Sequence, residues 1–246
     1  MNKNNKLLLN MVYVALFSAM AFVGTFVHIN FGEAIGMLHL GNFVGILAAL
    51  LFGGIIGGLS GSIGMGLYDI LHGYPFDTVI RTLVVKFVAF FIIGTFFKIL
   101  TKREKKQYLV PIILFVIFLL FGGGLIYTYY TTNIEKLHSI LVITGGIIMS
   151  VFSIYYLVVF ILKNKFNKMM YDVLIATSLG IIVQIVLEFL LRIILQVIIG
   201  NGWQESVLVS ITKLPTAMVN GTITIILIQV FFMPLYLAVR KIIKKW

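Results

Sequence analysis

The sequence contains no cysteine, only four prolines and only eight acidic residues among its 246 positions. Without cysteine, disulfide bonds, thiol catalysis and thiolate-bound metals are excluded. Charged residues make up 11% of the chain and hydrophobic residues 61%, whereas soluble domains have about 25% and about 45–50%. A soluble core cannot bury so many apolar side chains, which excludes a cytosolic enzyme, a nucleic-acid-binding protein and a disordered chain. The composition predicts an all-α polytopic membrane protein.

The apolar runs set the number of predicted helices, because a spanning helix needs about 20 such residues. The region 41–68 has no charged residue and is too long for one span, so we expect two short helices joined by a tight turn near Phe52–Gly54. The whole chain, 1–246, is then one transmembrane domain with about eight helices, predicted at 7–27, 41–68 (two), 77–100, 108–130, 137–162, 169–199 and 206–239.

The basic residues predict the orientation of these helices. About 14 of the 19 lysines and arginines fall in four segments that all lie on one side of the membrane if the amino terminus is cytoplasmic. The loops on the other side then hold only Lys136. The positive-inside rule therefore predicts that both termini are cytoplasmic. The four basic segments are Lys3/Lys6, Lys98–Lys106, Lys163–Lys168 and Arg240–Lys245.

Four cations remain inside predicted spans: Arg81, Lys86, Arg192 and Lys213. A charge at the centre of a spanning helix costs about 2.5–3.5 kcal/mol, so each is expected to face the protein interior or a water-filled cavity. Counting 1.5 Å per residue from the outer helix ends places all four about 6–13 Å below the outer face.

Two of these cations have an acidic residue four positions earlier, Asp77 before Arg81 and Glu188 before Arg192. This is the better orientation for a helical ion pair. Each pair could simply neutralise itself and fix helix packing. Lys86 and Lys213 have no such neighbour, which makes them better candidates for contacting a ligand or a distant carboxylate. Polar groups that converge from several helices on an outward-facing cavity are typical of a small-molecule site.

Other chemical motifs are weaker. Gly58-Leu59-Ser60-Gly61 matches a pattern of intramembrane serine proteases, but no later histidine stands in a suitable mid-helix setting to act as the base. A metal site built from His28, Glu33, His39 and His72 lacks the tight spacing of metal-binding motifs. There is no phosphate-binding loop, so we expect that the chain does not hydrolyse ATP.

Several motifs occur together in a characteristic order. The sequence runs from His39-Leu40-Gly41-Asn42, through a small-residue helix and a Phe52-Gly53 turn, to a glycine-rich stretch ending at Tyr68-Asp69. This order resembles the substrate-binding S components of energy-coupling-factor (ECF) vitamin transporters. The resemblance is strongest to the branch named for riboflavin, which also contains a proposed pyridoxine carrier. It covers residues 7–100 well and 170–240 loosely.

The resemblance implies a six-helix bundle with both termini inside, without a catalytic site or a cofactor. The core helices would lie at 7–100 and 169–240, and the two extra helices at 108–162 would form an inserted transmembrane hairpin. Ala15 and Ala19 match the family's Ala-x-x-x-Ala motif, which contacts the energising module. Implied partners are a vitamin-like substrate, a transmembrane coupling protein and two ATPase subunits, in a bacterial plasma membrane and among its lipids.

The buried charges and the resemblance together give one set of candidate substrate-binding residues: His39, Asn42, Tyr68, Asp69, His72, Asp77, Arg81, Lys86, Glu188, Arg192, Lys213 and Asn220. The substrate would be riboflavin, a B6 vitamer or a similar small molecule. A self-sufficient secondary transporter or channel is the alternative function. That alternative predicts internal repeats with broken helices in matching positions, yet the glycine cluster occurs only once in the chain.

Overall fold

Eight helices make up nearly all of the structure, a computed structural model that describes residues 3–30, 37–103, 109–131, 136–162 and 167–243. Seven helices are long and apolar enough to cross a membrane, and the eighth, α2, is a shorter apolar helix. The prediction of an all-α polytopic membrane protein is therefore confirmed. The helices are α1 (Lys3–Phe26), α2 (Gly41–Phe52), α3 (Gly54–Leu71), α4 (Phe76–Lys102), α5 (Leu109–Thr131), α6 (Lys136–Ile161), α7 (Lys168–Ile198) and α8 (Trp203–Ile243).

The predicted turn between two short helices lies between α2 and α3. Gly53 separates them with a φ of 100°, a left-handed backbone conformation that favours glycine. The 12 residues of α2 extend only about 18 Å at 1.5 Å per residue, less than the roughly 30 Å hydrocarbon core. The sequence analysis expected about eight spans. The structure has seven helices long enough to cross a membrane and one, α2, that is too short to cross alone.

A small β-ribbon, which the sequence analysis did not predict, connects α1 to α2. Its strands β1 (His28–Asn30) and β2 (Met37–His39) pair antiparallel, with His28 opposite His39. The Leu40 amide, directly after β2, donates a hydrogen bond to the Gly24 carbonyl at 3.1 Å, which anchors the ribbon to the end of α1. Residues 31–36, which include Glu33, lie outside the described residues.

The glycines of α3 allow three other helices to approach it closely. A Cβ atom at Gly57 would overlap Ala49 of α2, one at Gly61 would overlap the Phe90 ring of α4, and one at Gly64 would overlap the backbone of α1. Small residues are the usual means by which membrane helices pack backbone to backbone. The glycine cluster therefore lets α3 pack closely against α1, α2 and α4.

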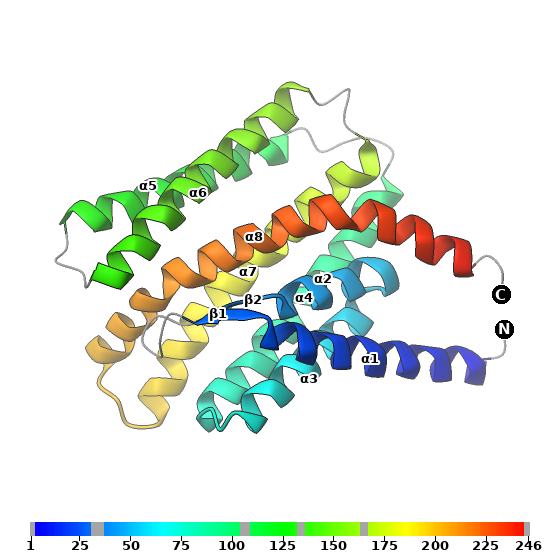
Figure 1. Ribbon diagram of the computed structural model, residues 1–246, viewed down its shortest axis with the longest axis horizontal. Coiled ribbons are helices and arrows are strands. Elements are labelled where there is room, and N and C mark those ends of the chain that lie inside the picture. Colours follow the sequence, from blue (N-terminus) through cyan, green and yellow to red (C-terminus); the bar gives the residue numbers. More distant parts are fainter. Residues whose placement is uncertain (1–2, 31–36, 104–108, 132–135, 163–166, 244–246) are drawn as a thin grey trace.

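Both termini lie at the same end of the bundle, where α4 also ends and α7 begins (Figure 1). We call this the terminal end. It carries the basic residues that the structure describes in the four segments, among them Lys6, Lys98 and Lys168. Lys105, Lys106, Lys163, Lys165, Lys244 and Lys245 lie outside the described residues. That the terminal end is cytoplasmic stays a prediction from the charge distribution.

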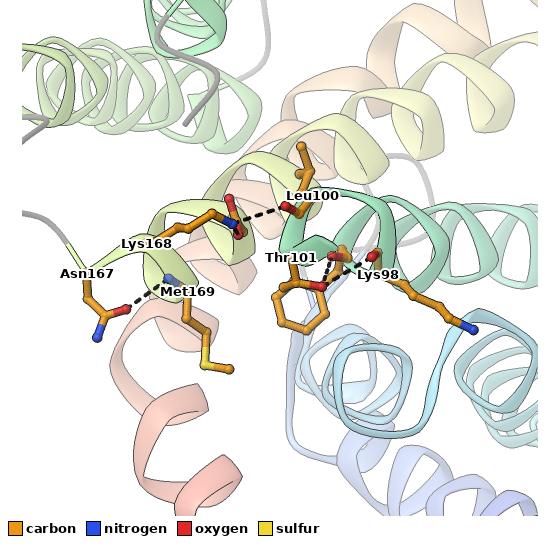
Figure 2. Close-up of polar contacts among 8 residues, drawn as sticks. Lys98, Leu100, Thr101, Asn167, Lys168 and Met169 are labelled. Atoms are coloured by element: carbon orange, nitrogen blue, oxygen red, sulfur yellow. Dashed lines mark hydrogen bonds and ion pairs between the residues drawn. The ribbon is translucent and has the colours of Figure 1, made fainter. Parts of the chain in front are cut away.

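A network around the half-buried Lys168 joins α4 to α7 at the terminal end (Figure 2). The Lys168 ammonium donates to the Leu100 carbonyl of α4 at 3.1 Å and forms an ion pair with Asp172, one turn along α7, at 2.6 Å. The Asn167 side chain accepts a hydrogen bond from the Met169 amide and so caps α7. These contacts hold the two helices that carry most of the membrane charges.

Helices α5 and α6 pack against each other and lie alongside α8 on the outside of the bundle (Figure 1). The aromatic rings of Phe118, Phe152 and Tyr156 pack together between them. The Tyr156 hydroxyl is hydrogen-bonded to Ser178 of α7, which ties the pair to the bundle. The interpretation of 108–162 as an inserted hairpin stays a prediction, although the packing of this pair is compatible with it.

The close approach at Gly94 of α4 gives a test of the packing. A Cβ atom there would be forced against the backbone of Gly54 and the carbonyl of Ala49, neither of which can easily move. We expect Gly94→Ala to lower the free energy of unfolding by about 1–3 kcal/mol through overpacking. Thermal unfolding in detergent should show a lower midpoint. Gly123→Ala, at an exposed helical glycine of α5 with open space around it, is the matched control. Equal midpoints for the two variants would contradict the packing.

Candidate functional site

A cavity of about 830 Å³ lies between the helices. The helix ends that form it are those opposite the terminal end in Figure 1. The carboxyl ends of α1 and α3, the amino end of α4, the β-ribbon, and parts of α7 and α8 form its wall. Pockets for small molecules typically measure about 300–1,000 Å³. Among the described residues, α2, α5 and α6 contribute no lining side chain.

Most of the residues predicted for the site line this one cavity: His39, Tyr68, Asp69, His72, Arg81, Lys86, Glu188, Arg192, Lys213 and Asn220. The two exceptions are Asn42 and Asp77. Asn42 is fully buried in α2, where its amide group has no hydrogen-bond partner among the described residues. Asp77 does not line the cavity and lies beside Arg81.

Both predicted ion pairs are present. Arg192 donates to the Glu188 carboxylate at 3.1 Å. Arg81 lies 3.8 Å from the Asp77 carboxylate and donates to the Thr78 hydroxyl at 3.3 Å. The shorter pair is a charge-assisted hydrogen bond, whereas the longer one is an ion pair beyond hydrogen-bonding distance. Arg81 therefore makes a weaker contact with its paired carboxylate than Arg192 does.

Lys86 is the most isolated of the buried cations. Its side chain is only 8% exposed, and within the described part of the chain its ammonium group makes no hydrogen bond and no ion pair within 4 Å. The carboxylates that act on it electrostatically are those of Glu188 and Asp69, on two other helices. The expectation that Lys86 faces a ligand or a distant carboxylate agrees with this position.

Uncharged side chains of the wall were missed by the sequence analysis: Thr25, Met37, Met65, Thr78, Thr82, Gln184, Thr216 and Ala217. Two of them contain buried polar atoms without a hydrogen-bond partner in the described structure, the amide oxygen of Gln184 and the hydroxyl of Thr216. Such orphaned atoms are costly to bury unless water or a ligand satisfies them. For the polar residues among them, the sequence signal that could have identified them was their position inside an apolar run.

Aromatic stacking shapes one side of the cavity. The rings of Tyr68 and His72 stack with centroids 3.9 Å apart, and His72 Nδ1 lies 2.9 Å from the Tyr68 carbonyl. Phe26 of α1 packs edge-on against Tyr68. These contacts fix the end of α3 at the mouth of the cavity and leave Asp69, the next residue, on its wall.

His39 is a neutral member of the wall. Its Nδ1 atom is buried without a partner among the described residues. Burial, followed by the nearby Lys86 ammonium, lowers the pKa of His39 to about 3. The imidazole is therefore uncharged near neutral pH and offers one donor and one acceptor.

The weaker chemical hypotheses gain no support from the geometry. In the part of the chain that the structure describes, no group of three or more His, Cys, Asp or Glu residues could hold a metal ion; Glu33, one of the residues considered, lies outside that part. The Ser60 hydroxyl is fully buried and has no hydrogen bond to a histidine or to any other described group. A serine nucleophile needs such a base.

Comparison with known families decides what kind of protein this is. The model of the family "ECF-type riboflavin transporter, S component" matches residues 6–162. The chain belongs to this family. It is therefore a multi-pass membrane protein and a substrate-binding component of a transporter, from a family of transport subunits rather than of enzymes. The predicted resemblance to ECF S components is confirmed.

One further relative is an uncharacterized protein of Pyrococcus woesei, described as lying in a gap 3′ region. It is 31% identical over 121 residues, which cover 46% of this S component and 80% of the relative. No solved structure gives a significant match.

The family match includes α5 and α6 and stops before α7. It therefore does not show which pair of helices is additional to the family's bundle. In the structure, α7 and α8 supply cavity-lining residues, whereas α5 and α6 pack mainly on each other. That 108–162 is the additional pair stays a prediction.

The neutral His39 should make the S component less stable at low pH. Its pKa is lowered in the folded state, so its contribution to stability is complete above about pH 6.5, the ordinary histidine value. That contribution is lost as the pH falls from there towards about 3. We expect the unfolding midpoint of the wild-type protein to decrease more between pH 7 and pH 4.5 than that of His39→Gln. Parallel curves for the two proteins would contradict the assigned pKa.

Proposed function

We propose that this S component captures a vitamin-sized molecule in the charged cavity from outside the cell, for ATP-driven import by partner subunits. The observation that carries the proposal is the convergence of buried charged and unpartnered polar groups from five elements on a single cavity. A cavity of that size encloses a molecule of vitamin size.

The position of the cavity supports capture from outside. The helix ends that line the cavity lie away from the basic terminal end in Figure 1. Since lysine and arginine accumulate on the cytoplasmic side, the cavity would face the exterior of a cell membrane. A substrate bound there would need an external source of energy to move inwards, because the sequence has no phosphate-binding loop.

The surface around Ala15 and Ala19 is suited to docking a partner helix. Both alanines are exposed on α1. They border a groove of about 1,320 Å³ between α1, α3 and α4, which is lined mainly by apolar side chains and has Lys6 and Lys98 at one end. We call this the α1 groove. Small residues four positions apart allow close helix approach, so the α1 groove is the proposed contact with a transmembrane coupling protein that carries two ATPase subunits.

The capture function predicts that a small molecule accompanies the purified protein. We expect mass spectrometry of the detergent-purified S component to detect one vitamin-sized molecule. Ala217→Trp, which places a large ring in the cavity wall, should reduce its recovery at least tenfold. Ala238→Trp, at an exposed alanine of α8 outside the cavity wall, is the control.

Thermal unfolding of each variant shows whether it folds. If Ala217→Trp does not fold, Thr216→Val replaces it, because it removes a hydroxyl from the wall with little change in volume. Equal recovery from folded cavity and control variants would contradict the assignment of the cavity.

The proposed docking at the α1 groove predicts a separate effect, on assembly with the partner subunits. The double variant Ala15→Trp/Ala19→Trp should no longer copurify with a coexpressed coupling protein and its ATPases, because the tryptophan rings occupy the α1 groove. Its recovery of the small molecule should stay at the wild-type level, because neither alanine lines the cavity. Ala238→Trp again serves as the control. Normal assembly of the double variant would show that the partner binds another face.

A further inference from the structure

The geometry points to a ligand that carries a carboxylate or phosphate group, recognised by Lys86 together with Arg81 and Arg192. This inference rests on the proposed function, because it names the chemical class of the molecule captured in the same cavity. An anionic ligand would differ from riboflavin, the molecule named in the family description, because riboflavin is neutral. The charge balance, the unsatisfied donors and the composition of the wall each support it.

The first argument is the charge balance. Among the described residues of α4 and α7, the cations Arg81 and Arg192 each have a paired carboxylate, Asp77 and Glu188. Lys86 lines the same cavity and has no carboxylate within ion-pair distance in the described structure. His39 is neutral and adds no charge. An anionic ligand would give Lys86 a close counter-charge, whereas a neutral ligand would leave it buried without one.

The second argument is the set of unsatisfied donors. The Lys86 side chain is more than nine-tenths buried, lines the cavity and makes no hydrogen bond or ion pair in the described structure. Arg81 uses one terminal nitrogen for Thr78, and its other contact, to Asp77, is 3.8 Å long. A guanidinium has five N–H donors, so most of those on Arg81 remain available. Buried donors of this kind are what a carboxylate or phosphate oxygen accepts from.

The third argument is the way these cations are arranged. Arg81 and Lys86 lie on α4 and Arg192 on α7, and the two guanidinium groups are close enough to act on each other electrostatically. Like charges held close together in a protein interior destabilise it unless a counter-charge lies between them. The Lys168 network holds α4 and α7 together at the far end, so the helices are not free to separate. A bound anion would add to the counter-charge of Glu188, on which Lys86, Arg192 and Arg81 all act electrostatically.

The rest of the wall describes the rest of the ligand. The amide oxygen of Gln184 and the hydroxyl of Thr216 have no hydrogen-bond partner in the described structure. The amide oxygen can accept a hydrogen bond from a ligand, and the hydroxyl can donate or accept one. The ligand is therefore expected to carry hydroxyl or N–H groups besides its anionic group. Tyr68 and Tyr74 supply the phenol rings of the described wall, which contains no phenylalanine or tryptophan. A large neutral ring system would find little aromatic surface to stack against.

Matched ligand pairs test the inference directly. Calorimetric titration of the full-length, delipidated S component would compare pyridoxine with 4-pyridoxate and with pyridoxine 5′-phosphate, and riboflavin with flavin mononucleotide. Each pair differs chiefly in the anionic group. We expect the anionic member of at least one pair to bind at least tenfold more tightly than its neutral counterpart. The molecule that accompanies the purified protein should also carry a carboxylate or phosphate.

Charge variants connect the preference to Lys86. Lys86→Met keeps most of the apolar stem and should remove most of the preference for the anion, whereas Lys86→Arg should retain it. Lys98→Met, at an exposed lysine near the opposite end of the same helix, should behave as wild type. Thermal unfolding identifies any variant that does not fold, and in that case Lys86→Gln replaces Lys86→Met. A preference that persists without the Lys86 charge would overturn the role of this residue.

The outcomes separate the inference from the proposed function. If the neutral members bind as well as the anionic members, or if the accompanying molecule is neutral or cationic, the inference is wrong while capture in the cavity stands. If no member binds and no small molecule accompanies the protein, the capture function itself is wrong and the inference fails with it. Tighter anion binding that depends on Lys86 supports both.

Discussion

A charged side chain can stay inside an apolar helix bundle only where an opposite charge, water or a polar ligand reaches it. This constraint explains why Arg81, Lys86, Glu188 and Arg192 all face a single cavity instead of being scattered over the bundle. Insertion of each into a membrane is unfavourable, so their convergence on one cavity supports the proposed binding site. The ion pairs reduce the cost, and the Lys86 ammonium is the charge that a ligand would offset.

The packing elsewhere in the bundle allows these charges to meet. The glycines of α3 bring α1, α2 and α4 close to it, which places the ends of α3 and α4 side by side at the cavity. At the opposite end, Lys168 satisfies a carbonyl at the end of α4 and joins that helix to α7. Side chains on α4 and α7 therefore face one another from two helices with a fixed spacing. The cavity depends on contacts that lie far from it.

Much of the fold and part of the site could be predicted from sequence because charges and glycines stand out in apolar runs. The spans, the turn at Gly53 and both i,i+4 ion pairs were correctly predicted. The three-residue strands were missed because so short a segment shows no alternation of polar and apolar residues. Depth along a helix is countable but rotation about its axis depends on packing, so the sequence does not tell that Arg81 lines the cavity while Asp77, one turn earlier, does not. Gln184 and Thr216 were missed because uncharged polar residues occur at many positions in membrane helices.

The side of the bundle on which α5 and α6 lie has a consequence for assembly. They flank α8, whereas α1 and α3 form the other side of the molecule (Figure 1). The α5–α6 pair thus widens the area that the protein occupies in the bilayer without covering the α1 groove. Growth of the bundle on the α8 side leaves the proposed docking surface open, so that a larger subunit and a shared partner do not conflict.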